Sequence, residues 1–439
     1  MQNSSRKALV ITYGCRQNEN DSERIRGMLE KEGYAFCEST AEADLVIFNT
    51  CAVRENAEHK LYGNVGALKA YKERKPHMII GICGCMVQQD GEAEQIKKRF
   101  RHVDFVFGTH AIPRLPKILR EASHERVFDT EETVGIYEDL PIKRDSILTA
   151  NIPISYGCNN FCSYCVVPYV RGRERSRMPE AILNEASELA KAGCKEVILL
   201  GQNVNSYGND NSVMSFPQLL REIDKIDGIE RIRFISSHPK DLSDDLVDAM
   251  AECESVCAQL HLPFQSGSDR VLKGMNRKYT SADYLKLIDK ARSRIPNISL
   301  SSDVIVGFPT ETQEDFEDTI KLINTVGFDT LYTFIYSPRR GTPAAKKPSV
   351  LTEEQIKANF ERLVDVQSGW SLKKNKELEN KTLRILVEGR SKNNLNTLSG
   401  RTEGNKVVNF IGDESLIGSF VDVTVTKALS WSLEGKINN

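Results

Sequence analysis

Three cysteines stand within eight residues of one another in this chain of 439 residues, at Cys158, Cys162 and Cys165. They follow an apolar run, residues 149–155, that predicts a β-strand. Thiolates at this spacing can converge on one metal centre. Three are one too few for the cysteine sites of a four-iron cluster, so one iron would stay open to a substrate. The alternative is a structural zinc site completed by a distant His or Cys, but zinc sites more often use paired Cys-x-x-Cys units, and no second pair follows here.

A second group consists of Cys15, Cys51 and Cys85, each of which follows an apolar run that predicts a strand. Residues just past the carboxyl ends of neighbouring parallel strands meet in one crevice, so these thiols can ligate a second cluster with one open iron. Cys83 competes with Cys85, but it lies inside the apolar run, whereas Cys85 follows Gly84 at a turn; we therefore choose Cys85. The alternative is that all three are buried small residues.

The composition describes a soluble globular protein, with 40% hydrophobic and 27% charged residues. Because the formal net charge is only −2, any nucleic-acid binding must come from local basic surface. No apolar run reaches the roughly 18 residues of a membrane span, and the first residues carry no signal-peptide pattern. We therefore expect a cytoplasmic location and no membrane partner. Eleven cysteines in a reducing compartment are ligands, catalytic thiols or core residues rather than disulfides.

Strands and helices alternate in two series, which predicts an α/β protein with an N-terminal open parallel domain and a second domain of β/α units. The expected strands of the first domain are residues 8–13, 44–49, 78–83 and 103–108, with helices at 21–32 and 55–74. Those of the second are 149–155, 196–200, 231–235, 258–262, 299–306 and 330–336, with helices at 179–192, 241–251, 281–294 and 313–325. Six β/α units indicate a partial (β/α)6 barrel, and the cysteine group at 158–165 follows its first strand, where barrel enzymes place their chemistry.

The pattern of apolar runs and turn residues changes again near residue 381. Short runs at 382–388, 397–400, 406–410, 420–427 and 431–436, separated by turn residues, predict a small C-terminal β-barrel. The expected domains are residues 1–125, 146–376 and 377–439. The charged segment 121–146 is interpreted as the connection between the first two.

Together the two cysteine groups resemble the cluster motifs of the radical-SAM methylthiotransferase family, over about residues 7 to 436. The motifs are Thr12-Tyr13-Gly14-Cys15, Asn49-Thr50-Cys51, Gly84-Cys85 and the run from Cys158 to Cys165. Within the family, four runs resemble the members that act on isopentenyladenosine in tRNA: 167–172 (VPYVRG), 200–205 (LGQNVN), 236–239 (SSHP) and 399–410 (SGRTEGNKVVNF). The resemblance implies a radical-SAM core at 146–376 and an RNA-binding TRAM domain at 377–439.

The resemblance also implies an activity. It is the transfer of a methylthio group to C2 of N6-isopentenyladenosine next to the anticodon of tRNA, using two 4Fe-4S clusters and two molecules of S-adenosylmethionine (SAM) per product. The tRNA anticodon loop, a low-potential electron donor of flavodoxin or ferredoxin type and a sulfur donor are the expected partners. Related enzymes that share both motifs act on threonylcarbamoyl-adenosine in tRNA or on an aspartate of a ribosomal protein. An iron–sulfur RNA-binding sensor is the non-enzyme alternative, but it does not explain why both clusters keep an open site.

Polar residues at or near the strand ends of the second domain are the candidates for holding SAM: Gln202, Ser236, Gln265 and Asp303. The backbone groups of residues 304–307, ending at Gly307, are expected to approach the adenine of SAM. The alternative is that these polar residues only cap turns, as polar residues at strand ends often do. Alternating arginines follow the second cysteine group and can meet RNA phosphate, although they can equally form a solvated face with Glu174. These arginines are Arg171, Arg173, Arg175 and Arg177. Arg401 and Lys406 are the corresponding candidates in the C-terminal barrel.

Overall fold

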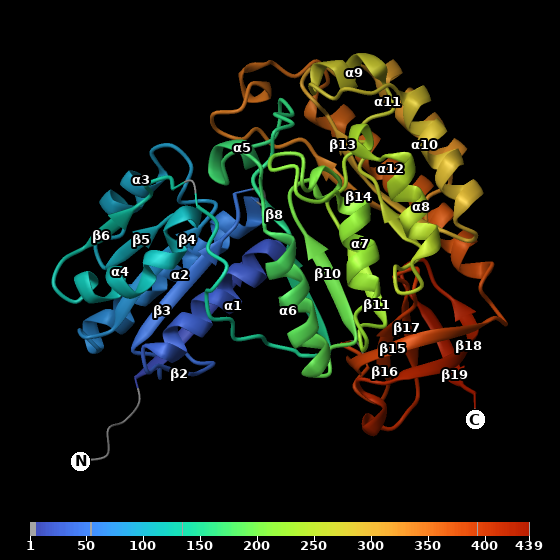
Figure 1. Cartoon of the computed structure of the whole chain (residues 1–439). Coiled ribbons are helices and arrows are strands. Elements are labelled where there is room, and N and C mark those ends of the chain that lie inside the picture. Colours follow the sequence, from blue (N-terminus) through green and yellow to red (C-terminus); the bar gives the residue numbers. More distant parts are fainter. Residues whose placement is uncertain (1–5, 53–54, 134, 393, 439) are drawn as a thin grey trace.

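The computed structural model describes residues 6–52, 55–133, 135–392 and 394–438. Three parts follow one another along the chain: an α/β domain, a larger α/β barrel, and a small β-barrel that lies against the lower end of the middle part (Figure 1). This arrangement confirms the predicted fold class. None of the described helices is long and apolar enough to cross a membrane.

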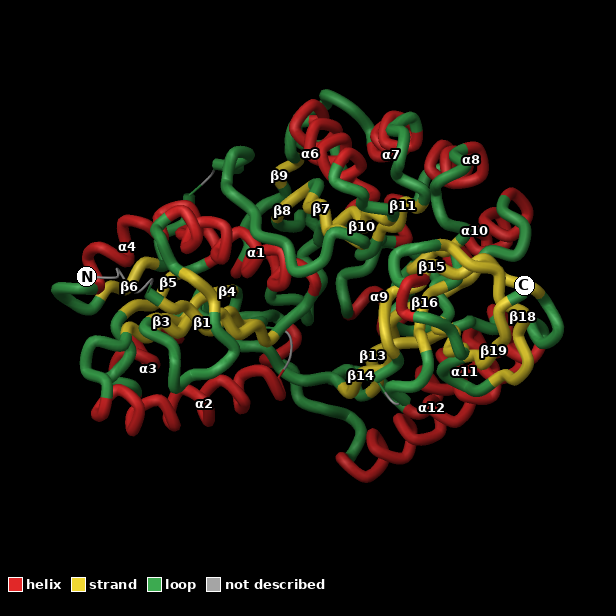
Figure 2. The backbone as a smooth tube through the Cα atoms, turned by 90° about the horizontal axis from the view of Figure 1, so that it is seen from below, coloured by secondary structure: helices red, strands yellow, loops and turns green. Residues whose placement is uncertain are grey.

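The first domain is a parallel sheet in the order β2-β1-β3-β4-β5-β6. Its strands are β1 (Lys7–Tyr13), β2 (Ala35–Phe36), β3 (Leu45–Thr50), β4 (Ile79–Gly84), β5 (Phe105–Phe107) and β6 (Val127–Asp129). Its helices are α1 (Arg16–Lys31), α2 (Glu55–Arg74), α3 (Glu92–Arg99) and α4 (Leu115–Ala122), the last preceded by the 3-10 turn η1 (Thr109–Arg114). Helices α1 and α4 cover one face and α2 and α3 the other (Figure 2). Because both faces are covered, every residue of β3 is buried.

Two edge strands were not expected from the sequence. With two and three residues, β2 and β6 are too short to show a hydrophobic period. Strand β6 lies inside the segment 121–146, interpreted above as a connection, and it pairs in parallel with β5. The first sheet therefore extends past residue 125, where the sequence placed the end of the domain.

Six parallel strands form the partial barrel of the middle domain, as the sequence predicted. They belong to two three-stranded sheets, β11-β10-β7 and β12-β13-β14, and a parallel bridge from Ile232 to Val256 extends the first towards the second. The strands are β7 (Thr149–Pro153), β10 (Glu196–Leu200), β11 (Arg231–Phe234), β12 (Gln259–His261), β13 (Ser299–Val306) and β14 (Thr330–Ile335). The short β8 (Ser155–Tyr156) and β9 (Arg175–Ser176) form a separate antiparallel pair.

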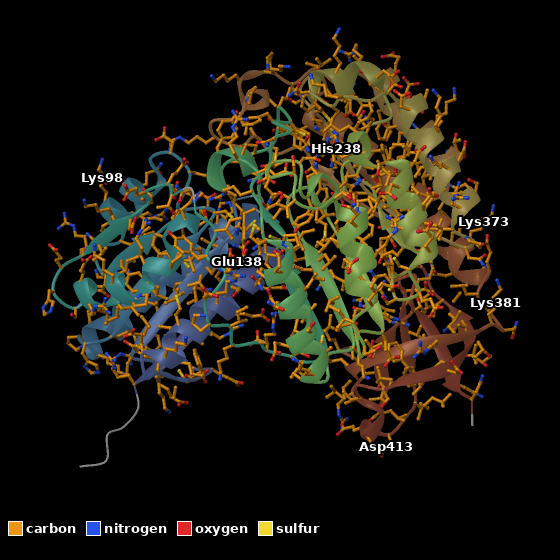
Figure 3. The ribbon with its side chains drawn as sticks, viewed as in Figure 1. Lys98, Glu138, His238, Lys373, Lys381 and Asp413 are labelled. Carbon is orange, nitrogen blue, oxygen red and sulfur yellow. The ribbon has the colours of Figure 1, made fainter. Side chains whose placement is uncertain are left out.

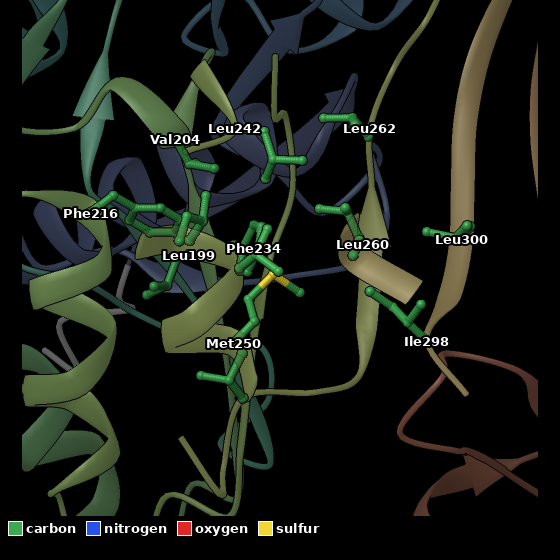
Figure 4. Close-up of a cluster of buried hydrophobic side chains, with 14 of the residues drawn as sticks. Leu199, Val204, Phe216, Phe234, Leu242, Met250, Leu260, Leu262, Ile298 and Leu300 are labelled. Carbon is green, nitrogen blue, oxygen red and sulfur yellow. The ribbon is translucent and has the colours of Figure 1, made fainter. Parts of the chain in front are cut away.

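Helices pack around the outside of these strands. They are α6 (Pro179–Lys191), α7 (Phe216–Asp224), α8 (Asp244–Glu252), α9 (Asp269–Gly274), α10 (Ser281–Arg294) and α11 (Gln313–Val326). The short α5 (Val167–Val170) packs against the first domain instead. Leu199 and Phe234 from adjacent strands pack against Phe216 of α7 and Met250 of α8 (Figure 4). The rings of Phe216 and Phe234 meet edge to face, with centroids 5.1 Å apart. This apolar core fixes the strands whose carboxyl ends carry the candidate site.

The long helix α12 (Glu353–Lys376) packs against β14 and leads into the C-terminal domain. That domain is a closed five-stranded barrel in the order β15-β16-β17-β19-β18. Its strands are β15 (Thr382–Arg390), β16 (Leu398–Arg401), β17 (Val407–Phe410), β18 (Phe420–Ala428) and β19 (Leu433–Ile437). Residues such as Ile385, Val408 and Val423 fill its interior. The predicted start of this domain at residue 377 directly follows the end of α12, and we keep 146–376 and 377–439 as proposed domain limits.

Candidate functional site

The first sulfur group lies at one edge of the N-terminal sheet. Cys15, Cys51 and Cys85 each follow one of the adjacent strands β1, β3 and β4, so the parallel pairing brings them to the same edge. Cys15 is the N-cap residue of α1, and the backbone N–H of Cys51 donates to the carbonyl of Tyr13 at 2.9 Å. Gly84 precedes Cys85 with φ +103°, and a Cβ there would lie 2.4 Å from the carbonyl oxygen of Thr50. Only glycine allows β4 to end so close to β3.

The thiol of Cys15 interacts with the thiols of Cys51 and Cys85. A hydrogen bond with the Cys51 thiol lowers the pKa of the Cys15 thiol to about 6, with a further contribution from the positive charge of Arg171. Burial raises the pKa of the Cys85 thiol, and the charge of Arg171 opposes that rise. Cys83, by contrast, lies within β4 and packs in the apolar core beneath α1 and α4.

Arg171 brings the middle domain into contact with this group. Its side chain is buried, and its Nε donates to the Sγ of Cys85 at 3.1 Å. Its Nη2 donates to the Oδ2 of Asp21 at 2.6 Å, and Asp21 is a buried residue of α1. From the sequence, Arg171 was expected to meet RNA phosphate, but a guanidinium that is buried and paired inside the protein does not face RNA.

The second sulfur group, Cys158, Cys162 and Cys165, occupies the loop between β8 and α5. Phe161 adopts φ +47°, an uncommon conformation for a non-glycine residue, and the Asn276 side chain donates to its carbonyl at 2.9 Å. The backbone N–H of Cys165 donates to the carbonyl of Cys162 at 2.9 Å. Local turns of this kind hold the three thiols on one short loop.

Burial lowers the acidity of two thiols of this second group. It raises the pKa of Cys158 to about 11 and that of Cys165 to about 12, where the neighbouring cysteines contribute in the same direction. Arg277, buried on the α9–α10 connection, approaches this group with its Nη1 at 3.7 Å from the Sγ of Cys162. Its Nη2 donates to the carbonyl of Pro263 at 2.5 Å. Arg277 could not be identified from the sequence, because its spacing from the cysteines carries no recognisable motif.

The donor chemistry of both groups suits iron–sulfur clusters. Each brings three thiols to one place, and each has a buried guanidinium beside one sulfur, which can compensate the negative charge of thiolates. Within the described ranges, no three His, Cys, Asp or Glu side chains are grouped so as to hold one metal ion. A cluster of several irons needs its thiolates farther apart than a single ion does.

Polar side chains gather at the carboxyl ends of the barrel strands, close to the second group. Ser236 follows β11 with φ +68°, and Gln265 follows β12 with φ +67°. Non-glycine residues with positive φ store backbone strain, and such strain is concentrated at functional sites. The side-chain oxygen of Gln202 accepts from the backbone N–H of Gly157, next to Cys158. Three of the predicted SAM ligands, Gln202, Ser236 and Gln265, therefore follow strands of the barrel, at the positions expected from the sequence.

Several buried polar atoms at these strand ends lack a hydrogen-bond partner among the described residues. They are Oδ1 of Asn203, both amide atoms of Asn205, Oγ of Ser237 and Oε1 of Gln265. Buried polar groups are nearly always paired, so a set of unpaired ones indicates a polar ligand or water. Apart from Gln265, none of these residues was a candidate from the sequence.

Two further candidates have partners inside the protein. The carboxylate of Asp303 lies 3.5 Å from Nε2 of His261. The backbone N–H of Gly307 donates to the buried Glu311 carboxylate at 2.6 Å, and a Cβ at Gly307 would meet Ile356 of α12 at 2.9 Å. Packing against α12 explains the glycine without a cofactor.

A cavity of about 530 Å³ lies between all three domains. This volume is within the range of small-molecule sites. The cavity joins Cys15 of the first sulfur group to Ser236 of the strand-end group, and Arg401 of the C-terminal barrel lines it as well. Its other lining residues are Arg16, Ser146, Leu148, Thr149, Glu196, Ile198, Arg233, Ile235, Gln259, His261, Ser301, Tyr332, Glu388 and Asn405. The rings of His261 and Tyr332 meet edge to face at 5.7 Å, and Tyr332 is 49% exposed.

The remaining arginines that follow the second sulfur group differ in exposure. Arg177 is buried between Glu138 and Glu185, at 2.6 and 2.7 Å, and Glu138 lies at the junction of the first two domains (Figure 3). Like Arg171, it does not face RNA, which corrects the expectation from sequence. Arg175 is half-buried and donates to backbone carbonyls. Arg173 is exposed, and its guanidinium lies 4.3 Å from the ring centroid of Phe161.

The two basic candidates of the C-terminal barrel are both engaged in ion pairs. Arg401 pairs with Glu388 at 3.1 Å, and its side chain is 33% exposed. Lys406 pairs with Asp329 of the middle domain at 2.8 Å, and its side chain is 15% exposed. Lys406 therefore holds the two domains together in this structure, whereas Arg401 is more accessible.

Three family models match consecutive parts of the chain. Residues 7–108 match the uncharacterized protein family UPF0004, residues 152–323 the radical SAM superfamily, and residues 376–437 the TRAM domain. Each match falls within one of the three structural parts described above.

Curated relatives match nearly the whole chain. A protein of Alkaliphilus oremlandii is 52% identical over 437 residues, which cover 99% of this chain and 93% of that protein. A protein of Acetivibrio thermocellus is 53% identical over 430 residues, covering 97% and 90%. Both are named tRNA-2-methylthio-N(6)-dimethylallyladenosine synthase.

Solved structures share the fold at low sequence identity. The radical S-adenosylmethionine methyltransferase TsrM of Kitasatospora setae superposes with a TM-score of 0.58 and 15% identity, covering 78% of this chain and 74% of that one. The cobalamin-dependent radical enzyme OxsB superposes with a TM-score of 0.56 and 13% identity, covering 83% and 56%. At these identities the likeness concerns the fold alone.

Proposed function

Because the chain belongs to the family of tRNA-2-methylthio-N(6)-dimethylallyladenosine synthases, we propose that it transfers a methylthio group to C2 of N6-isopentenyladenosine next to the anticodon of tRNA. The family relationship rests on relatives at 51–53% identity over almost the full length of both chains. The chain is thus a radical-SAM transferase, and the reaction is proposed to use two SAM molecules per product.

Two 4Fe-4S clusters are proposed, one at Cys15, Cys51 and Cys85 and one at the loop from Cys158 to Cys165. Three thiols and a neighbouring buried guanidinium in each group support this assignment. When bound, the clusters and SAM supply the one-electron chemistry and the methylthio group, which no side chain of the protein can provide. The protein itself has to hold both groups beside one base and exclude water.

The strand-end residues are proposed to hold SAM. The unpaired Oε1 of Gln265 and the strained backbone of Ser236 and Gln265 support a polar ligand at this position. Gln202 fixes the loop before Cys158 through its bond to Gly157, so it orients the cluster loop as well. Asp303 remains a proposed contact, since its carboxylate is 27% exposed.

The cavity between the domains is proposed to take the target base. Enzymes that modify a base must extrude it from its stack, and single-stranded RNA is read by stacking and edge contacts. Tyr332 and His261 offer aromatic surfaces in the cavity, and Arg401 offers positive charge there, while the exposed Arg173 is a proposed RNA contact outside the cavity. The C-terminal barrel matches the TRAM domain, which supports tRNA as the partner. A low-potential electron donor of flavodoxin or ferredoxin type, a sulfur donor and a cytoplasmic location complete the proposal.

The observation that carries this function is that one cavity joins Cys15 of the first sulfur group to Ser236, at the carboxyl end of β11 in the radical-SAM barrel. The test is to reconstitute the protein anaerobically and incubate it with SAM, a reductant and tRNA that bears N6-isopentenyladenosine. Mass spectrometry of the digested nucleosides then measures the 2-methylthio product. We expect product from the parent and from Cys253→Ala, a control at a buried cysteine outside both groups, but none from Cys158→Ala or Cys51→Ala.

The two possible failures have different meanings. If 5′-deoxyadenosine forms while the nucleoside is unchanged, the radical chemistry holds and the substrate is wrong, which favours threonylcarbamoyl-adenosine or a ribosomal-protein aspartate. If neither forms with both clusters verified, the catalytic assignment fails and an iron–sulfur RNA-binding sensor is favoured.

A further inference from the structure

A single buried side chain links the two sulfur groups. Arg171 follows helix α5, which begins two residues after Cys165, so only five residues separate a cysteine of the second group from the guanidinium that contacts the first. That guanidinium donates to the Sγ of Cys85 at 3.1 Å and to Asp21 at 2.6 Å. Both contacts cross from the middle domain to the first domain.

The packing around Arg171 keeps it in this position. Val166, just before α5, and Val170, its last residue, are buried against Ala52 and Cys85 (Figure 1 shows α5 at this junction). The hydroxyl of Thr109 donates to the carbonyl of Val170 at 2.8 Å. An apolar contact and a hydrogen bond therefore fix α5 against the first domain. Arg171 directly follows this helix, so its position is fixed as well.

Two opposite charges, the Arg171 guanidinium and the Asp21 carboxylate, lie beside the N-terminal sulfur group. The positive charge of Arg171 lies beside Cys85 and within electrostatic reach of Cys15, while the Asp21 carboxylate on its other side carries the opposite charge. Hydrogen bonds and charges at cluster sulfurs are among the factors that set a cluster's reduction potential. A positive charge stabilises the more negative, reduced cluster, and a carboxylate destabilises it.

We infer that Arg171 is a positioning residue for the N-terminal sulfur group: its guanidinium raises the reduction potential of the cluster at Cys15, Cys51 and Cys85, and Asp21 moderates that effect. This inference rests on the proposed function, which places a cluster there. It gives the radical-SAM domain a direct electrostatic influence on the cluster of its neighbour.

The experiment uses the full chain with Cys158, Cys162 and Cys165 changed to Ala, so that iron is held at the N-terminal group alone. Into this parent we introduce Arg171→Gln, Arg171→Lys and Asp21→Asn, and we measure iron content and the midpoint potential by an EPR-monitored redox titration. Arg171→Gln should shift the reduction equilibrium at least tenfold towards the oxidised cluster, which is about 59 mV more negative for one electron. Asp21→Asn should shift the potential in the opposite direction, and Arg171→Lys should stay nearer to the parent.

The opposite signs distinguish this role from a structural one, since general damage to the site would move both variants alike. Equal potentials in the parent and all variants would overturn the inference, as would a shift of Arg171→Lys as large as that of Arg171→Gln. If Arg171→Gln loses its iron, the other two variants still test the inference. Asp21→Asn should then raise the midpoint potential, while Arg171→Lys should stay near the parent. If the parent itself holds no iron, the two-cluster proposal fails together with the inference; if it holds iron without the expected shifts, only the inference fails.

Discussion

At the scale of single residues, the two sulfur groups differ in how their thiols ionise without metal. Cys15 has a thiol partner and a nearby guanidinium, and its pKa falls to about 6. At Cys158 and Cys165 burial outweighs the nearby positive charges of Lys240 and Arg277, and their pKa values rise to about 11 and about 12. Because thiolates are the ligands, cluster assembly has to displace the protons of Cys158 and Cys165, whereas Cys15 loses its proton at a much lower pH.

This difference predicts a pH-dependent reactivity of the iron-free protein. A lowered pKa means that the thiolate of Cys15 forms at lower pH, so its alkylation by iodoacetamide should reach half its maximal rate near pH 6. Cys158 should show no such transition below about pH 9, since its pKa is raised. Peptide mass spectrometry after brief labelling at a series of pH values measures both rates. Arg171→Gln should move the Cys15 transition to higher pH, and a Cys15 profile like that of an ordinary thiol would contradict the prediction.

The six cysteines and the polar residues Gln202, Ser236 and Gln265 could be chosen as candidates from residue type and spacing, because short motifs and strand ends can be recognised in the sequence alone. The role of Arg171 was not visible. Its partner Cys85 is 86 positions away in sequence and belongs to another domain. The sequence therefore showed an alternating arginine run and suggested RNA contacts, whereas burial removes Arg171 and Arg177 from the surface and leaves Arg173 exposed.

At the scale of elements, the loop between β8 and α5 depends on one close approach of the backbone. Gly157 adopts φ +77°, and a Cβ there would lie 2.1 Å from the carbonyl oxygen of Arg173. That carbonyl belongs to the segment that returns past the cysteine loop, and the backbone N–H of Cys158 bonds to the adjacent Gly172 carbonyl at 3.2 Å. The hairpin formed by β8 and β9 is therefore what presents the second sulfur group.

We predict that Gly157→Ala prevents this loop from holding iron. Positive φ alone costs a residue with a Cβ about 1–2 kcal/mol, and at Gly157 a backbone clash is added. Gly193→Ala is the matched control, because Gly193 has φ +95° but open space around the added Cβ. The control should be modestly less stable and load iron at both groups, whereas Gly157→Ala should load iron at the N-terminal group alone. Iron content and absorbance after reconstitution measure this, and equal iron in the two variants would refute it.

Most elements of the barrel could be predicted because each strand is a compact apolar run. The observed β10 and β13 have the predicted bounds. The strands β2 and β6 could not be predicted, because a pairing of two or three residues is decided by its neighbour in the sheet and not by its own sequence. The strained conformations of Ser236 and Gln265 were equally hidden, since they follow from how the surrounding barrel closes.

At the scale of the whole molecule, the three domains share one cavity, so their relative placement is part of the site. On the C-terminal side, two arginines of β11 reach into the small barrel. Arg231 donates to the carbonyls of Arg401 and Arg384 at 2.8 and 2.9 Å. Arg233 donates to the carbonyls of Thr402 and Glu403 at 2.7 and 2.6 Å. These bonds fix the turn after β16, next to Arg401, which lines the cavity.

Arg233 should consequently matter more than any exposed ion pair at this junction. It pairs with Glu196 at 2.9 Å, and both side chains are buried, at 4% and 3% exposure. Arg233→Leu leaves the Glu196 carboxylate buried without a partner, for which we expect a loss of about 3–5 kcal/mol in the free energy of unfolding. Arg384→Leu, which removes an ion pair to Glu230 from a side chain that is 59% exposed, should cost at most about 1 kcal/mol.

Urea denaturation and limited proteolysis of the segment between α12 and β15 measure these effects. Cleavage there should accelerate in Arg233→Leu, because the small barrel loses its attachment to β11. The double variant Glu196→Leu/Arg233→Leu should recover part of the free energy of unfolding but not the resistance to cleavage. That separation follows from the two kinds of partner that Arg233 has: the pair with Glu196 lies inside the middle domain, whereas the bonds to the Thr402 and Glu403 carbonyls cross to the small barrel. If the double variant regained both properties, the attachment would reside elsewhere in the junction, and Arg231 would be the next residue to change.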